Sequence, residues 1–164
     1  MGKFLALVIG IAGGLLGSQA PGFTLQYMQD LSGRVAQLKE LVEEFDAGIA
    51  RYGYTREQAL RECTDAEGLL DALCDGYEVT VRDYLDLSAH LEELRATSDY
   101  ERPILLARTY RENVVDSVME EFKPAVPTTA DGAAYAGGGL AGFWAIFSGI
   151  WALITAPFRR RAEA

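Results

Sequence analysis

Residues Phe4–Phe23 read FLALVIGIAGGLLGSQAPGF, and no side chain in this run is ionisable. A helix needs about 20 apolar residues to cross the roughly 30 Å hydrocarbon layer of a bilayer, and this run reaches that length. A second run, Gly132–Phe158, carries no ionisable group apart from the phenol of Tyr135. Two such runs in a chain of 164 residues predict two transmembrane helices, over residues 1–23 and 135–158.

The first run also shares features with a cleaved signal peptide. Lys3 supplies a charged start, and Ser18-Gln19-Ala20 resembles the small-residue site that precedes a cleavage point. Pro21 would then follow the cut, where proline is a poor substrate residue. We therefore expect the segment to be retained as a transmembrane helix.

Charge separates the middle of the chain from its ends. Residues 24–131 hold 23 acidic and 11 basic side chains, whereas Lys3 and residues 159–164 give the ends a net charge of +3. Basic flanks of transmembrane helices stay cytoplasmic, so the pattern predicts a bacterial inner-membrane protein. Both termini would be cytoplasmic and the acidic domain periplasmic. We expect no nucleic-acid partner, because binding phosphates requires a basic surface.

Within the acidic domain, residues 24–123, apolar residues recur every three or four positions, which is typical of amphipathic helices. Pro21 predicts a bend before this domain, and Thr55-Arg-Glu-Gln58 predicts a capping box at a helix start. We expect helices over about 24–52, 56–63, 66–96 and 103–122, followed by a linker over 124–134. The predicted fold is all-α: two transmembrane helices bracket an extramembrane antiparallel helical bundle or coiled-coil-like insert. The fourth helix would pack within the chain or across a dimer.

Both apolar runs contain small residues spaced like one face of a helix. Such stripes let helices approach closely in lipid, where no hydrophobic force drives them together. The predicted helix-packing residues are Ala6, Gly10, Gly14, Ser18, Gly138, Gly142, Ala145 and Gly149.

Cys63 and Cys74 flank the expected break between the second and third helices. In an oxidising compartment they would form a disulfide, and a turn between them is needed to bring them within reach. The alternative is two free thiols on a packed apolar face.

The remaining polar residues do not form a pattern that indicates catalysis. His90, beside Glu92 and Glu93, is expected to be a surface histidine, and the sequence has no zinc-ligand spacing. No serine stands in a nucleophile elbow, and no glycine loop is followed by a phosphate-binding lysine. We therefore expect a protein that is not an enzyme, with no cofactor, no metal and no catalytic residue.

The chain resembles an uncharacterised family in three segments: the stretch AGGLLGSQAPGFTLQYMQDLSGRVAQLKELVEEFD, the GYTREQAL turn and the second apolar run. This family comprises proteobacterial two-span inner-membrane proteins and is known as a domain of unknown function. The resemblance implies location and architecture and supplies no mechanism.

Two functional interpretations follow. In the first, the protein is an accessory subunit or assembly partner of a larger membrane complex, such as a respiratory or photosynthetic one. Its transmembrane helices would contact partner helices, and its acidic face would attract a basic soluble protein. In the second, it is a self-associating membrane scaffold whose apolar heptad faces pair between copies.

Overall fold

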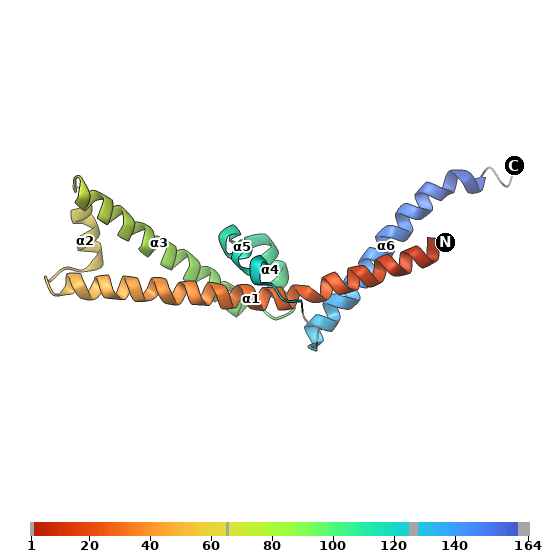
Figure 1. The fold of residues 1–164 in the computed structure, drawn as a ribbon, viewed down its shortest axis with the longest axis horizontal. Helices are drawn as coiled ribbons and strands as arrows, with labels where there is room; N and C mark the ends of the chain where they lie inside the picture. The colour runs from red at the N-terminus through yellow and green to blue at the C-terminus, as the bar shows by residue number, and fades with distance from the viewer. Residues whose placement is uncertain (1, 65, 125–127, 161–164) are drawn as a thin grey trace. The chain divides into compact units, whose positions relative to one another are not determined.

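The computed structural model describes residues 2–64, 66–124 and 128–160, and all the regular secondary structure in these ranges is helical (Figure 1). The prediction of an all-α chain is confirmed for this part of the sequence. The helices are α1 (Gly2–Ala50), α2 (Arg56–Cys63), α3 (Leu69–Ala96), α4 (Arg102–Thr109), α5 (Glu112–Glu121) and α6 (Ala130–Arg160). By length and composition, two segments are able to cross a membrane, Phe4–Ala50 in α1 and Ala130–Thr155 in α6.

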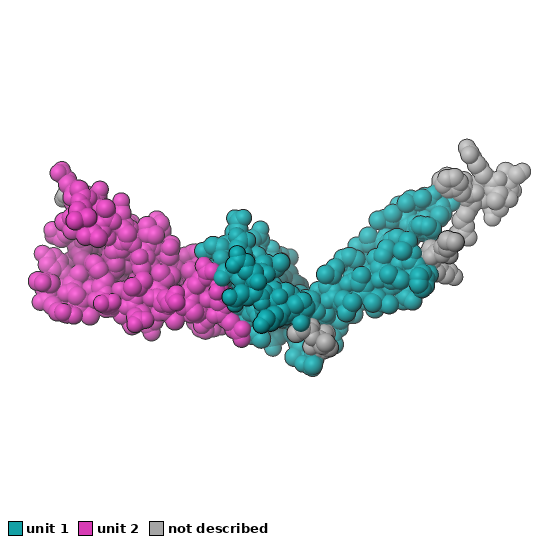
Figure 2. All heavy atoms as spheres, in the orientation of Figure 1, with its two compact units in different colours: residues 1–26, 98–164 teal, residues 27–97 magenta. Residues whose placement is uncertain are grey.

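The chain divides into two compact units, coloured separately in Figure 2. Unit 1 comprises residues 1–26 and 98–164, which hold the first half of α1 together with α4, α5 and α6. Unit 2 comprises residues 27–97, which hold the second half of α1 together with α2 and α3.

Pro21 lies inside α1, so the helix does not end where the sequence suggested a boundary between residues 1–23 and 24–52. A proline removes one backbone donor and crowds the carbonyl of the residue four positions earlier. Here that residue is Gly17, which packs against α6, while Thr24 on the other side of the proline is buried. Packing on both sides therefore offsets the loss of one hydrogen bond.

In unit 2, the chain turns sharply after α1. Gly53 has a φ of 80°, the Gly53 N–H donates to the carbonyl of Ala50, and the Tyr54 N–H donates to that of Ile49. This is a Schellman motif, which needs a left-handed residue and therefore favours glycine. The expected capping box follows: the Gln58 N–H donates to Thr55 Oγ1, and the Thr55 N–H donates to Gln58 Oε1. Together the two motifs fix where α1 stops and where α2 begins.

The second half of α1 packs against α3 within unit 2. Val42 of α1 forms a buried cluster with Tyr77 and Val81 of α3, and the Tyr27 hydroxyl lies 3.2 Å from Nε2 of His90. Val42, near the end of α1, thus contacts the first half of α3, whereas Tyr27, in the middle of α1, contacts the second half of α3. The two helices therefore run antiparallel. The helix α3 starts at Leu69, three residues later than expected, after Gly68 with a φ of 68°.

In unit 1, the structure has α4 and α5 where one helix over 103–122 was expected. Tyr110 and Arg111 between them are extended, with ψ angles of 153° and 121°. The apolar residues of this segment, from Leu106 to Phe122, recur every four positions. On an α-helix four residues turn about 40° too far, so this stripe drifts around the surface. The break lets Leu106 and Val114 both be buried, while Tyr110 is left exposed.

The helix α6 begins at Ala130, inside the range expected to be a linker. Thr129 caps it: the N–H of Gly132 donates to Thr129 Oγ1 at 3.3 Å, and the N–H of Ala133 donates to its carbonyl at 3.0 Å. A threonine at this position satisfies backbone donors that the first turn leaves open. Part of the expected linker, residues 125–127, lies outside the described residues.

Candidate functional site

Unit 1 brings the first half of α1 against α6 at glycines (Figure 1). A Cβ atom added to Gly17 would lie 2.5 Å from the carbonyl oxygen of Tyr135, and one added to Gly139 would collide with the backbone carbonyl of Gly13. These neighbours are backbone atoms, which cannot rotate away as a side chain can. The close approach of the two helices therefore requires glycine at positions 17 and 139.

The structure places the four predicted packing residues of the first helix on one buried stripe. Ala6 and Ser18 are buried, and Cβ atoms added to Gly10 and Gly14 would lie 3.3 Å and 3.1 Å from carbonyl oxygens of α6. The stripe faces α6.

The four predicted packing residues of the second helix lie elsewhere. Cβ atoms added to Gly138, Gly142 and Gly149 would meet no atom within 4 Å, and Ala145 is exposed. The α6 glycine that meets the backbone of α1 is instead Gly139, which was not among the predicted packing residues. We call Gly138, Gly142, Ala145 and Gly149 the free small-residue face of α6.

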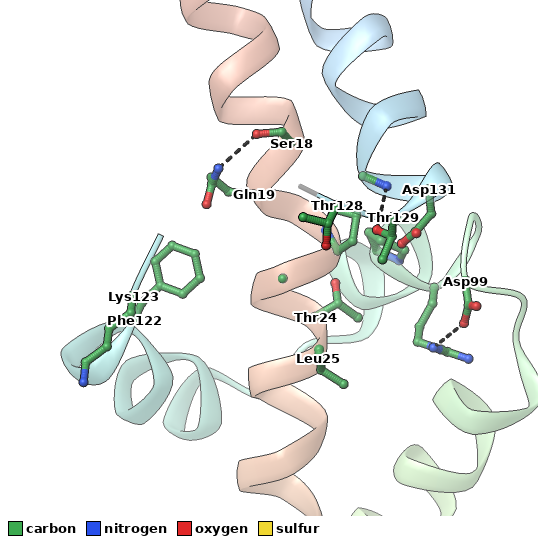
Figure 3. A pocket seen from close by; sticks show the side chains of 15 residues that line it. Ser18, Gln19, Thr24, Leu25, Asp99, Phe122, Lys123, Thr128, Thr129 and Asp131 are labelled. Carbon is green, nitrogen blue, oxygen red and sulfur yellow. Dashed lines mark hydrogen bonds and ion pairs between the residues drawn. The ribbon is translucent and has the colours of Figure 1, made fainter. Parts of the chain in front are cut away.

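Unit 1 also contains a pocket of about 320 Å³ whose lining includes several polar side chains (Figure 3). The guanidinium of Arg102 lies 2.7 Å from the carboxylate of Asp99, so each neutralises the other. The two buried hydroxyl groups of the wall donate along α1: Ser18 to the carbonyl of Leu15, and Thr24 to that of Ala20. These polar groups already have structural partners.

In unit 2, Asp46 joins three segments of the chain. Its carboxylate accepts hydrogen bonds from Nε and Nη2 of Arg56 at the start of α2, and from the hydroxyl of Tyr77 in α3 at 3.1 Å. The Arg56 hydrogen bonds are the main cause that holds the pKa of Asp46 below its ordinary value. Burial, and then the bond to Asp46, raise the pKa of Tyr77 to about 12. The Tyr77 ring also stacks on Phe45, with ring centroids 3.4 Å apart.

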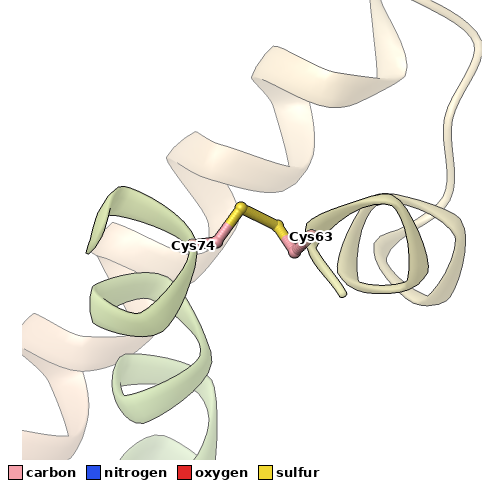
Figure 4. Close-up of a disulfide and its surroundings, with 2 residues drawn as sticks. All are labelled: Cys63 and Cys74. Atoms are coloured by element: carbon pink, nitrogen blue, oxygen red, sulfur yellow. A yellow bond between two sulfur atoms is a disulfide. The ribbon is translucent and has the colours of Figure 1, made fainter. Parts of the chain in front are cut away.

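Next to this cluster, the ends of α1 and α2 and the start of α3 enclose an apolar groove of about 440 Å³. We call it the aromatic groove and define it by Phe45, Ile49, Tyr52, Tyr54, Leu70 and Leu73. Cys63 and Cys74 also line it, and they form a disulfide that ties the end of α2 to α3, with Cα atoms 5.6 Å apart (Figure 4). The turn that the sequence analysis required between the two cysteines is present. Composition alone gave no signal for a groove, because its residues come from three helices and from the turn between α1 and α2.

His90 is buried, with 4% of its surface exposed, so the expectation of a surface histidine was wrong. Its ring meets that of Tyr27 edge to face, with centroids 5.9 Å apart. The apolar stripe of α3 therefore includes His90, whose imidazole meets the tyrosine hydroxyl. In the part of the chain that the structure describes, no three His, Cys, Asp or Glu side chains converge as metal ligands would.

Comparison with known proteins gives one finding. No curated protein and no solved structure matches the chain. A family model described as protein of unknown function (DUF2937) matches residues 1–160. The expected membership of an uncharacterised family is thus confirmed, and the chain belongs to the DUF2937 family of proteins of unknown function.

Proposed function

We propose that this protein is a non-enzymatic, two-span inner-membrane protein that serves as an accessory subunit or assembly partner of a larger membrane complex. A respiratory or photosynthetic complex of a proteobacterium is the setting that we favour. The observation that carries the proposal is the free small-residue face of α6, because α1 packs against a different face of the same helix.

The packing of unit 1 supports a partner in the membrane. Helices associate in lipid mainly through close van der Waals contact, which small residues permit. The α1–α6 contact uses Gly13, Gly17 and Gly139, so it leaves the surface around Gly142 and Gly149 available. A helix of another protein that packed there would bury a stripe that the chain itself does not use.

Charge and the disulfide support the proposed topology. The ends of the chain carry +3 and residues 24–131 carry −12, which favours cytoplasmic termini and a periplasmic acidic domain. Disulfides form and persist in the periplasm and are rare in the cytoplasm. The Cys63–Cys74 bond is therefore a second argument for the same side, independent of charge.

The acidic domain supports a second contact, with a basic soluble protein. Unit 2 alone holds 16 acidic and 7 basic side chains. A negative surface of this kind speeds the encounter with a cationic partner at low ionic strength. The proposed periplasmic helical domain would thus serve for recognition, while the two spans anchor it.

The test is extraction in mild detergent, followed by sizing and identification of the chains that co-purify. Wild-type protein should migrate with a larger complex, and the double variant Gly142→Leu/Gly149→Leu should lose it. The matched control is Gly137→Leu, because Gly137 also meets nothing within 4 Å but lies about 100° around the helix from Gly138.

Two results would contradict the proposal. A monomer that binds no other chain would refute an accessory role. A homo-oligomer without other chains would instead select the self-associating scaffold, with the heptad faces of unit 2 paired between copies.

A further inference from the structure

The aromatic groove of unit 2 exposes large apolar side chains. Leu70 and Leu73 are 60% and 62% exposed, and Tyr52 is 82% exposed. Leu69, beside them on α3, is 78% exposed. Single apolar residues on a surface need no explanation, but several of them around one groove mark an interaction site.

Four features fix the positions of the segments that form the groove. The Schellman turn at Gly53 and the capping box at Thr55 fix the connection between α1 and α2. The Asp46–Arg56 ion pair holds α2 to α1, and the disulfide holds it to α3. A site that is already formed before binding loses less entropy when its ligand arrives.

The chain from Glu57 to Glu78, which supplies the α2 and α3 residues of the groove, is acidic, and its Glu62 lines the groove itself. We call the acidic side chains of this stretch the acidic rim. Between Glu57 and Glu78 the sequence has seven acidic residues and one basic residue, Arg61. The six acidic side chains that the structure describes there are all exposed, namely Glu57, Glu62, Glu67, Asp71, Asp75 and Glu78. The charge of Arg56 is matched by Asp46 and does not offset them.

The charge determines which occupant the groove fits. A second copy of this chain would bring an equally acidic rim against the first, and the repulsion would oppose the contact. A segment with apolar side chains and flanking lysines or arginines would satisfy both the groove and its rim. Amphipathic helices that lay an apolar face into a groove are a common form of such recognition.

We propose that the aromatic groove binds a basic amphipathic segment of a partner protein, with its apolar side chains between α1, α2 and α3 and its cations on the acidic rim. This inference rests on the proposed interaction role, but it concerns unit 2, whereas the membrane contact of the proposed function concerns α6. It locates the contact with a basic protein in one groove.

The test uses the full chain reconstituted in phosphatidylcholine nanodiscs and a fluorescent 18-residue peptide of leucine and lysine with helical amphipathic spacing. Binding is followed by fluorescence anisotropy against empty nanodiscs, because such peptides also bind lipid. We expect saturable binding above the empty-disc signal that weakens as salt is raised. A peptide with glutamate in place of lysine, and one with serine in place of leucine, should each bind at least roughly tenfold more weakly.

Variants locate the site. Leu70→Ser/Leu73→Ser removes two exposed anchors without opening a core, and it should weaken binding roughly tenfold or more. Leu85→Ser is the matched control, since Leu85 is 54% exposed on the same helix outside the groove. Asp71→Asn/Asp75→Asn should reduce the salt dependence, whereas Asp83→Asn, further along α3, should not.

Several outcomes would overturn the inference. If the leucine–lysine peptide and its counterpart with glutamate in place of lysine bound equally, the charge would not select the ligand. If Leu85→Ser weakened binding as much as Leu70→Ser/Leu73→Ser, the ligand would not occupy the groove. A homodimer that the Leu70→Ser/Leu73→Ser variant abolishes would make the groove a self-interface. If the peptide fails to bind while the α6-dependent complex survives, the inference fails and the proposed function stands. If the peptide binds but no complex co-purifies, the inference stands and the proposed function fails.

Discussion

Asp46 links α1, α2 and α3 through its hydrogen bonds, and sequence patterns do not reveal this role. It is one of 24 acidic residues in the chain, and its neighbours along α1 do not distinguish it. Its partners Arg56 and Tyr77 lie 10 and 31 positions away in the sequence. Only the turn at Gly53 and the antiparallel course of α3 bring them together, so helix periodicity alone could not identify the cluster.

The first prediction concerns Asp46→Asn. The variant loses the ion pair with Arg56, and because both side chains are partly exposed we expect a cost of about 1 kcal/mol in local stability. Hydrogen exchange of α2 in the purified protein should therefore accelerate. Glu43→Gln is the control, since Glu43 and Lys39 are both largely exposed, and it should change exchange little. Equal effects of the two substitutions would contradict the prediction.

The second prediction is the pH dependence of the same cluster. The folded-state pKa of Asp46 is lowered, so its contribution is complete above the ordinary value of 3.8 and is lost as the pH falls through the folded-state pKa. The pKa of Tyr77 is raised, so its contribution is complete below 10.0 and is lost as the pH rises toward about 12. Protection of α2 from exchange, corrected for intrinsic rates, should fall in both windows. In Asp46→Asn the acid step should disappear.

At the scale of whole helices, the spacing of apolar residues predicted which segments are helical, but it did not predict local breaks and contacts. The part of the chain that the structure describes was correctly predicted to be helical, because apolar residues every three or four positions suit no other regular structure. The break between α4 and α5 was missed because no glycine or proline marks Tyr110-Arg111. Gly139 was missed because Gly137, Gly138 and Gly139 are consecutive and face directions about 100° apart. Spacing alone does not say which of the three meets α1.

The third prediction tests that contact. Gly139→Ala places a Cβ against the backbone of Gly13, so the helices must separate, at a cost of about 1–3 kcal/mol. Gly138→Ala is the control, because its Cβ meets nothing within 4 Å and alanine favours helix. The two tryptophans of the chain, Trp144 and Trp151, both lie on α6, so thermal unfolding in detergent can be followed by their fluorescence. An equal midpoint in both variants would contradict the packing described here.

The fourth prediction concerns the disulfide. The bond closes a loop with a sequence separation of 11, for which chain-entropy arguments give roughly 3 kcal/mol. Cys63→Ser/Cys74→Ser should therefore free α2 and the start of α3 to open more often. Hydrogen exchange should rise in these segments and stay unchanged in α6. A rise spread evenly over the chain, or none at all, would contradict a local staple.

At the scale of the whole molecule, two kinds of surface are divided between the units. Unit 1 contains the glycine contact of the apolar helices, whereas unit 2 contains the acidic rim and the aromatic groove. Composition predicted a separation of charge-free apolar segments from an acidic middle, but not where the units divide, because residues 98–123, expected in the acidic domain, belong to unit 1. It could not predict the groove, which depends on how α1, α2 and α3 pack.

The last prediction concerns the membrane topology of the chain. The basic ends and the acidic middle favour cytoplasmic termini, and the disulfide favours an oxidising compartment for unit 2. Reporter fusions after Thr129 and after Ala164 should therefore lie on opposite sides of the membrane, the first periplasmic and the second cytoplasmic. Cys63 and Cys74 should be oxidised in normal cells and reduced in cells that lack the periplasmic oxidation system. Two fusions on the same side would refute the two-span arrangement. Cysteines that stay reduced in normal cells would place unit 2 in the cytoplasm and reverse the orientation.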